Sequence, residues 1–383
     1  MKTELKKSKN SIINTFACHD MLSKGEIVEK TGFSPALVST MMNELENEGI
    51  VYKTHFGASS GGRRPMMYRL GDDLFHCAAY KITTGGISLS IINIHGDILA
   101  SATYIEKIDD ESSLSFSFDV VTQKIKKEEA EKFALVKAVA ITLPGIMDNG
   151  NTTVSLSVPL CLKSFSFDHL VRKTFGKELP IKLFKDSDSQ ILAEYRYGTE
   201  KAENMAYVFV DDGIGFSMIQ NGRLLTSDKC SMELGHTVIS IDGEMCRCGR
   251  RGCAATILGG RPAARRYADR KNGAVDPQIL TYSSVIENAN NGEDVAKSVM
   301  EEQEKILSIL VINVINLFAP SVVVIGGAIS KYIGLSEMIQ EKVDNLSLNN
   351  STDRAKVSVS HLDMSFSLRS MAGELCKECF FTN

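Results

Sequence analysis

Apolar residues in the first part of the chain recur at helical spacing. They predict one helix over residues 11–21 and a second over residues 24–30. A third helix is expected to begin at Ser34, whose hydroxyl suits an N-cap. Pro35 suits its first turn, because the donor that proline lacks would be unpaired there in any case.

The third predicted helix has one apolar face and one free face. The apolar positions, expected to pack against the first two helices, are Leu37, Val38, Met41, Met42 and Leu45. The free face carries short side chains at Ser34, Pro35, Ala36, Ser39, Thr40 and Asn43. One face is therefore available for a partner.

After Gly49 the pattern changes from helical spacing to alternation. Residues 50–52 and 67–70 predict two strands, joined by a Gly/Ser-rich tip that carries Arg63 and Arg64. Residues 1–72 are thus predicted to form a winged helix-turn-helix that binds double-stranded DNA. The third helix would enter the major groove, and the arginine pair would reach phosphate or the minor groove. The alternative is a small helical protein-interaction domain with a solvated loop.

The rest of the chain, residues 73–383, is predicted to be α/β. Strand-like and helical runs alternate, which favours mixed sheets flanked by helices, and the length suits a repeated α/β half as in the actin-like ATPase fold. These runs are 77–82, 87–94, 136–142, 206–210 and 322–325 for strands, and 188–197 and 293–318 for helices. Core packing explains the apolar face of 293–318, although a subunit interface is an alternative.

Length and charge narrow the class of protein. A chain of 383 residues is long enough for two or three domains. The net charge is −4, but residues 1–70 hold ten basic and seven acidic side chains, so this segment is +3 and the remainder −7. DNA contact is therefore expected at one end only. Without a signal-peptide pattern or an apolar run of about 20 residues, we expect a cytoplasmic protein with no membrane contact.

Three of the nine cysteines lie within eight residues. Cys246, Cys248 and Cys253 are too close together to favour two disulfides, and in a cytoplasmic chain such a cluster indicates metal binding. The alternative is a set of reduced thiols around a turn. Other cysteines lie in apolar surroundings and are interpreted as inert core residues: Cys18, Cys77 and Cys161.

Several motifs in chain order make the sequence resemble the ROK family, and within it the repressor branch that includes the N-acetylglucosamine and xylose repressors. After the predicted winged helix they are Gly61-Gly62-Arg63-Arg64-Pro65, Leu143-Pro144-Gly145 with Asp148, Glu233-Leu234-Gly235-His236, the Cys246–Cys253 cluster and Ile325-Gly326-Gly327. The resemblance implies a two-lobed, actin-like, sugar-kinase-like fold that is usually a homodimer or homotetramer. It also adds His236 to the cysteines as the fourth ligand of a closed, structural Zn²⁺ site.

The resemblance also implies an effector pocket for a sugar or sugar phosphate. Its residues would be Gly145, Ser187, Asp188, Glu233 and His236. Asp188 lies where the family has its catalytic base, which here would be vestigial. Ser187 replaces the usual neighbouring asparagine, and Ala255 replaces a glutamate that contacts the sugar.

Two departures oppose ATP binding. The family's phosphate loop has an aspartate that helps to hold Mg²⁺, where this chain has Lys81, and the nearby glycine is displaced to Gly85. The second Gly-rich element begins with Asp211-Asp212, an anionic pair where nucleotide phosphates would lie. Kinase activity is therefore expected to be lost.

The sequence thus predicts a DNA-binding repressor of carbohydrate metabolism genes. Its DNA affinity would respond to a sugar or a sugar derivative. Two alternatives stay open: an ATP-dependent sugar kinase with an accessory DNA-binding domain, and a regulator without a small-molecule effector that is controlled by a protein partner or is constitutive.

Overall fold

The computed structural model divides into two compact units. Unit 1 comprises Met1–Phe184 and Leu368–Asn383, and unit 2 comprises Lys185–Ser367. The residues that the structure describes are 2–58, 64–148, 152–225, 232–272, 274–277, 279–346 and 355–381. Among them, no helix is long and apolar enough to cross a membrane.

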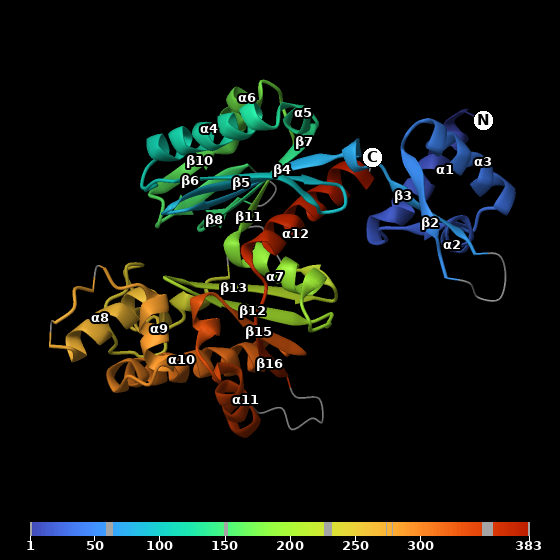
Figure 1. The fold of residues 1–383 in the computed structure, drawn as a ribbon. Coiled ribbons are helices and arrows are strands. Elements are labelled where there is room, and N and C mark those ends of the chain that lie inside the picture. Colours follow the sequence, from blue (N-terminus) through green and yellow to red (C-terminus); the bar gives the residue numbers. More distant parts are fainter. Residues whose placement is uncertain are drawn as a thin grey trace. The chain divides into compact units, whose positions relative to one another are not determined.

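Unit 1 begins with an N-terminal module, residues 2–70, made of three helices and a small sheet (Figure 1). The strands form an antiparallel sheet in the order β1-β3-β2. Its elements are α1 (Lys2–Thr15), η1 (Phe16–Cys18), β1 (Leu22–Ser23), α2 (Lys24–Thr31), α3 (Pro35–Asn47), β2 (Val51–Phe56) and β3 (Met66–Leu70). The first helix therefore begins and ends earlier than the predicted 11–21.

Local side-chain caps fix the starts of α2 and α3. Ser23 and Glu26 form a capping box, in which each side chain accepts from the other residue's backbone N–H. Gly32 ends α2 in the left-handed conformation, with φ of 69°. Ser34 then caps α3 and Pro35 occupies its first position, as predicted.

The core of the N-terminal module draws on both ends of the chain. Val38, Met41, Met42 and Leu45 on α3 are buried as predicted, while Leu37 is only partly buried. Two other partly buried side chains packed against the same core come from the last described residues, Phe380 and Phe381. The C-terminal end thus completes a core that the first 70 residues begin.

The rest of unit 1 is built on a five-stranded sheet in the order β11-β7-β4-β5-β6. Helix α4 packs on β5 and β6 (Figure 1). The elements are η2 (Asp72–Leu74), β4 (His76–Thr83), β5 (Gly86–Asn93), β6 (Ile98–Ile105), α4 (Glu111–Glu128), α5 (Ala130–Ala134), β7 (Val136–Leu143), β8 (Ile146–Met147), β9 (Thr153–Ser157), β10 (Leu162–Ser166), α6 (Phe167–Phe175) and β11 (Ile181–Lys185).

Unit 2 has its own five-stranded sheet in the order β14-β13-β12-β15-β16. Helix α7 packs on β12 and β13, and α8 to α11 pack on one another. The elements from Asp186 onward are α7 (Asp186–Tyr197), β12 (Met205–Val210), β13 (Ile214–Gln220), β14 (Arg223–Leu224), η3 (Leu234–His236), η4 (Ala254–Thr256), α8 (Gly260–Arg270), α9 (Tyr282–Asn290), α10 (Asp294–Phe318), β15 (Val322–Gly326), η5 (Ala328–Lys331), α11 (Leu335–Leu346), β16 (Lys356–Val359), α12 (Met364–Cys376) and η6 (Lys377–Phe381).

The two large sheets repeat one topology. In unit 1, β4, β5 and β6 form an antiparallel meander, and β7 then adds in parallel beside β4. In unit 2, β12, β13 and β14 form the same meander, and β15 adds in parallel beside β12. The mixed sheets are those that the alternation of strand and helix patterns favoured, and the chain length was compatible with this repeated α/β half.

One cysteine assignment from the sequence is wrong. Cys77 is buried in β4, as expected, but Cys161 is exposed. Cys161 lies in a turn between β9 and β10 with φ of 53°, so its apolar sequence neighbours point inward while its own side chain faces solvent. Nothing is described for the Cys18 side chain.

Candidate functional site

Four potential metal ligands meet in unit 2. One ligand atom each from His236, Cys246, Cys248 and Cys253 lies within 4.8 Å of all the others. The Sγ atoms of Cys248 and Cys253 are 3.6 Å apart, as are Cys246 Sγ and His236 Nδ1. A tetrahedral Zn²⁺ site requires ligand separations of roughly 3.5–3.8 Å, given its bond lengths. The cluster therefore fits a four-coordinate metal ion with no open position.

Two glycines give the cysteine loop its shape. Gly249 and Gly252 both have positive φ, 86° and 72°. A Cβ on Gly252 would lie 1.5 Å from the carbonyl oxygen of Ser240, so no other residue fits there. Backbone pairing of Cys246 N–H with the Arg250 carbonyl at 2.8 Å closes the turn. The loop thus turns tightly enough to bring the three sulfur atoms together.

The loop also favours the thiolate form at one cysteine. The backbone N–H of Arg250 lowers the pKa of Cys248 to about 6, assisted by the Arg250 side chain. Burial acts in the opposite direction at Cys253 and raises its pKa to about 11. A thiolate is the form that binds metal, and the hydrogen bonds from Arg250 favour that form at Cys248.

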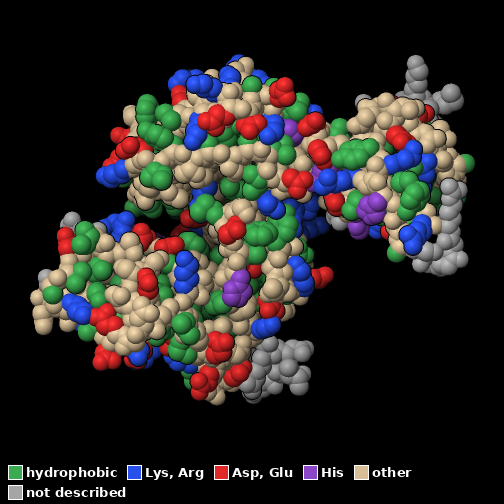
Figure 2. All heavy atoms as spheres, in the orientation of Figure 1, with side chains coloured by type: hydrophobic (Ala, Val, Ile, Leu, Met, Phe, Trp, Pro, Cys, Tyr) green, Lys and Arg blue, Asp and Glu red, His purple; other side chains and the backbone are tan. Residues whose placement is uncertain are grey.

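The free face of α3 is accessible as the sequence predicted. Ser34, Pro35, Ala36, Thr40 and Asn43 are exposed, and Ser39 is half-buried. Figure 2 shows Lys and Arg side chains spread over the visible face of the N-terminal module. Of the predicted arginine pair, Arg64 is exposed just before β3, and Arg63 lies outside the described residues.

Lys24, at the start of α2, also belongs to this face, although sequence reasoning did not select it. Its Nζ donates to Ser39 Oγ at 3.2 Å and to Asn43 Oδ1 at 3.0 Å, and it lies 5.6 Å from the centroid of the Tyr68 ring. The signal was present in the sequence as a basic residue beside the Ser23 cap, but its partners lie 15 and 19 residues away.

Charged side chains join the N-terminal module to the first large sheet within unit 1. Arg69 on β3 forms ion pairs with Asp20 at 2.9 Å, Asp72 at 3.2 Å and Asp97 at 3.6 Å. His95, in the turn between β5 and β6, places Nδ1 2.9 Å from Asp20 and Nε2 3.0 Å from the Leu70 carbonyl oxygen. These contacts tie the end of β3 to the sheet that follows it.

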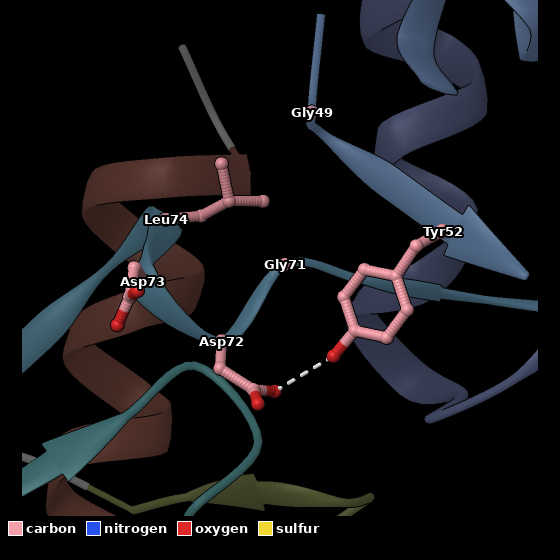
Figure 3. Close-up of a pocket in the computed structure, with 6 residues that line it drawn as sticks. All are labelled: Gly49, Tyr52, Gly71, Asp72, Asp73 and Leu74. Atoms are coloured by element: carbon pink, nitrogen blue, oxygen red, sulfur yellow. Dashed lines mark hydrogen bonds between the residues drawn. The ribbon is translucent and has the colours of Figure 1, made fainter. Parts of the chain in front are cut away.

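An open hollow of about 460 Å³ lies beside this network. In Figure 3, Asp72 points toward Tyr52, whose hydroxyl donates to its carboxylate at 3.1 Å, while Asp73 points away. The lining residues are Gly49, Tyr52, Gly71, Asp72, Asp73 and Leu74. None of the predicted effector residues lines this hollow.

Asp188, the predicted vestigial base, has a perturbed environment. It lies in the first turn of α7, and Ser217 on β13 donates a hydrogen bond to its carboxylate. Burial raises the pKa of Asp188 to about 6, against the opposing effects of Ser217 and Lys185. Ser187 is fully buried and donates to the Phe216 carbonyl oxygen, so it supports β13 and does not face an open pocket.

Glu233 is engaged with a lysine that sequence reasoning overlooked. Lys185, the residue before α7, contacts Glu233 Oε1 at 3.3 Å and donates to the Met232 carbonyl oxygen at 2.8 Å. Asp186, which was not selected either, is the first residue of α7, and its charge contributes to the raised pKa of Asp188. A sugar hydroxyl would therefore meet Glu233 already paired to a cation. Gly145, the remaining predicted effector residue, belongs to unit 1.

The glycines of the family motifs have local structural reasons in this chain. A Cβ on Gly86, beside Gly85 in the β4–β5 turn, would lie 2.3 Å from the Tyr104 carbonyl oxygen on β6. A Cβ on Gly145 would lie 2.8 Å from the Leu156 carbonyl oxygen. Lys81 lies within β4 and pairs in register with Ser88 and Thr142. These close approaches explain Gly86 and Gly145, whereas a Cβ on Gly85 would meet no atom nearer than Thr83 Oγ1 at 3.9 Å.

The second Gly-rich element places an acid at a helix start. A Cβ on Gly260, the first residue of α8, would lie 2.6 Å from Asp212 Oδ1. The N-terminus of a helix is the place where an anion such as phosphate is stabilised. Here the Asp212 carboxylate occupies that position.

Comparison with known proteins assigns the chain to a family. The model of the ROK family matches residues 86–372. The chain belongs to the ROK family. The xylose repressor of Caldicellulosiruptor bescii is 26% identical over 364 residues, which cover 92% of this chain and 90% of that protein.

Solved structures of ROK proteins show the same fold. A ROK family transcriptional regulator described as a homologue of the E. coli MLC protein superimposes with a TM-score of 0.79 and 19% identity, covering 96% of both chains. A ROK glucokinase from Streptomyces griseus, solved with glucose and AMPPNP, gives a TM-score of 0.67 at 20% identity. The superposition covers 99% of the glucokinase but 79% of this chain.

Proposed function

We propose that this chain is a sequence-specific DNA-binding transcriptional regulator, a repressor of carbohydrate metabolism genes. One observation carries the proposal: the exposed polar face of α3 stands on a packed module of three helices and a β2–β3 hairpin, which we interpret as a winged helix-turn-helix over residues 1–72. The regulator structure covers 96% of the chain, whereas the glucokinase covers 79%. The difference is about the size of this module.

In this proposal α3 enters the major groove of an operator. Ser34, Pro35, Ala36, Thr40 and Asn43 are the exposed residues on its free face, with Ser39 beside them. Arg64, together with Arg63, would reach phosphate or the minor groove from the wing. Because palindromic operators present two half-sites, we expect a homodimer or homotetramer.

The His236, Cys246, Cys248 and Cys253 cluster would hold a structural Zn²⁺. With four protein ligands the ion has no free position for substrate, so its contribution is to order the loop between η3 and η4. Since a folded metal site rarely exists in the unfolded chain, zinc binding would stabilise unit 2.

The effector proposed here is a sugar or sugar phosphate. Asp188 would bind a hydroxyl, and two further predicted contacts, Glu233 and His236, belong to the same unit. Lys185 contacts Oε1 of Glu233, so an entering hydroxyl would either share the carboxylate with Lys185 or bind its second oxygen. A ligand that binds one conformation of the protein more tightly than another would change the DNA affinity. The change can be as large as the difference between the ligand's binding free energies for the two conformations.

The test is binding of the full-length, zinc-loaded protein to the DNA upstream of its own gene and to genomic fragments. Gel shift and footprinting should reveal a protected site, and Asn43→Ala should weaken it. A thermal-shift screen with sugars and sugar phosphates then identifies the effector, because a ligand of the folded state raises the melting temperature. Failure to bind any DNA fragment would refute the proposal.

A second candidate is an ATP-dependent sugar kinase. The raised pKa of Asp188, about 6, suits a general base, and the glucokinase fold supports it. Lys81 in β4 and the Asp212 carboxylate at the start of α8 oppose nucleotide phosphates. Phosphate transfer from ATP to a hexose or acetylated amino sugar, abolished by Asp188→Ala, would establish this function in place of a purely regulatory one.

A further inference from the structure

Three side chains on the DNA-facing surface are held in one hydrogen-bonded group, which we call the donor patch: Lys24, Ser39 and Asn43. The Lys24 ammonium donates to both other members, at 3.2 Å to Ser39 Oγ and 3.0 Å to Asn43 Oδ1. The Tyr68 ring, which is buried, lies 5.6 Å from the same ammonium. Two hydrogen bonds and one aromatic face therefore fix the position of a side chain that is otherwise flexible.

The directions of these hydrogen bonds decide what the patch offers to a partner. An ammonium group only donates, so Asn43 must turn its amide oxygen toward Lys24. The Asn43 NH₂ group is then the part left for a partner, and Asn43 is exposed. Ser39 likewise uses an oxygen lone pair on Lys24 and keeps its O–H as a donor. The patch thus presents donors and directs its acceptors inward.

We infer that the donor patch reads a guanine in the operator, an inference that rests on the proposed DNA-binding function. The major-groove edge of guanine has two acceptors, N7 and O6, and no donor. Adenine presents one acceptor and one donor, and an asparagine that reads it must use its amide oxygen as well as its NH₂. In this chain Lys24 already uses one of the two lone pairs of that oxygen, which disfavours adenine, and the outward donors fit guanine.

The experiment begins with selection of duplexes from a random library by the full-length, zinc-loaded chain. Each guanine of the selected half-site is then replaced by 7-deazaguanine, which pairs normally but lacks N7. At one guanine per half-site we expect binding to weaken about tenfold, the loss typical of a specific base contact. Lys24→Met should weaken binding to the selected site and reduce the 7-deazaguanine effect there to less than twofold.

Two further variants separate base reading from charge and from folding. Lys30→Met removes an equal charge from an exposed position on the same helix and should keep the full 7-deazaguanine effect. Asn43→Asp keeps the acceptor for Lys24 but removes the outward NH₂ donors, so it should lose the effect with its circular dichroism spectrum and melting temperature unchanged.

Three results would overturn the inference. The first is a selected site in which replacing each guanine by 7-deazaguanine leaves binding unchanged. If Lys24→Met weakens binding equally on all DNA sequences and makes the affinity less dependent on salt concentration, then Lys24 contacts a phosphate. If Asn43→Ala instead loses the preference for adenine at one position of the site, Asn43 reads an adenine there. If the wild-type chain selects no sequence, the proposed function itself fails and this inference falls with it.

Discussion

Replacing Asp188 by asparagine should stabilise the protein at neutral pH and leave its stability unchanged in acid. Burial raises the pKa of Asp188 from 3.8 to about 6, so the folded protein binds the proton more tightly than the unfolded chain does. The stability associated with the protonated form is therefore present below pH 4 and is lost as the pH rises through about 6. Asparagine carries no charge at any pH and avoids that loss.

The magnitude follows from the two pKa values. At about 1.4 kcal/mol per pKa unit, ionising Asp188 costs the folded state up to about 3 kcal/mol above pH 7. Because the side chain keeps some solvent contact and asparagine still accepts from Ser217, we expect a gain of about 2 kcal/mol. For a unit of this size that is a rise of about 4–8 °C in melting temperature.

Thermal melting followed by far-ultraviolet circular dichroism at pH 4.5, 6 and 7.5 measures this difference. The chain contains no tryptophan, so circular dichroism is preferred to fluorescence. Asp269→Asn is the matched control, since Asp269 is an exposed aspartate in the same unit and its replacement should change little at any pH. A gain for Asp188→Asn that is equal at pH 4.5 and 7.5, or a loss at pH 7.5, would refute the reasoning from burial.

Three further perturbations test other parts of the structure. Cys253→Ser, or zinc chelation of the wild type, should lower the melting temperature of unit 2. Added zinc should restore the melting temperature of the chelated wild type but not that of the variant. Equal melting temperatures with and without chelator would refute a structural metal. Phe380→Ala or Phe381→Ala should destabilise the N-terminal module by about 1–2 kcal/mol and speed its hydrogen exchange, whereas Ile105→Ala, at an 83% exposed position, should not. His95→Ala should speed exchange at the end of β3, and unchanged exchange there would show that its contacts do not hold the strand.

Features that depend on neighbouring residues could be predicted from the sequence. Ser34 caps the backbone N–H of Leu37, three residues later, and Pro35 directly follows the cap. The three cysteine ligands lie within eight residues of the sequence. Five strands of the two large sheets, β4, β5, β7, β12 and β15, were also recognised, because buried strands are continuous apolar runs, whereas β6, β11, β13, β14 and β16 were not. The start of α1 was missed since residues 2–10 are mostly polar and show no helical period.

Features that depend on distant residues could not be predicted. Lys24 meets Asn43 only because α2 packs on α3, and Lys185 meets Glu233 across 48 residues. Neither contact leaves a pattern in a single sequence, since any of the chain's many lysines is an equal candidate. Cys161 shows the opposite error: apolar neighbours in sequence do not bury a residue whose backbone turns it outward.

Unit 1 is assembled from both ends of the chain, and this has a consequence during synthesis. During translation residues 2–70 emerge long before Phe380 and Phe381, the two side chains that pack against their core. The N-terminal module therefore acquires these two core contacts only after the whole of unit 2, Lys185–Ser367, has been synthesised.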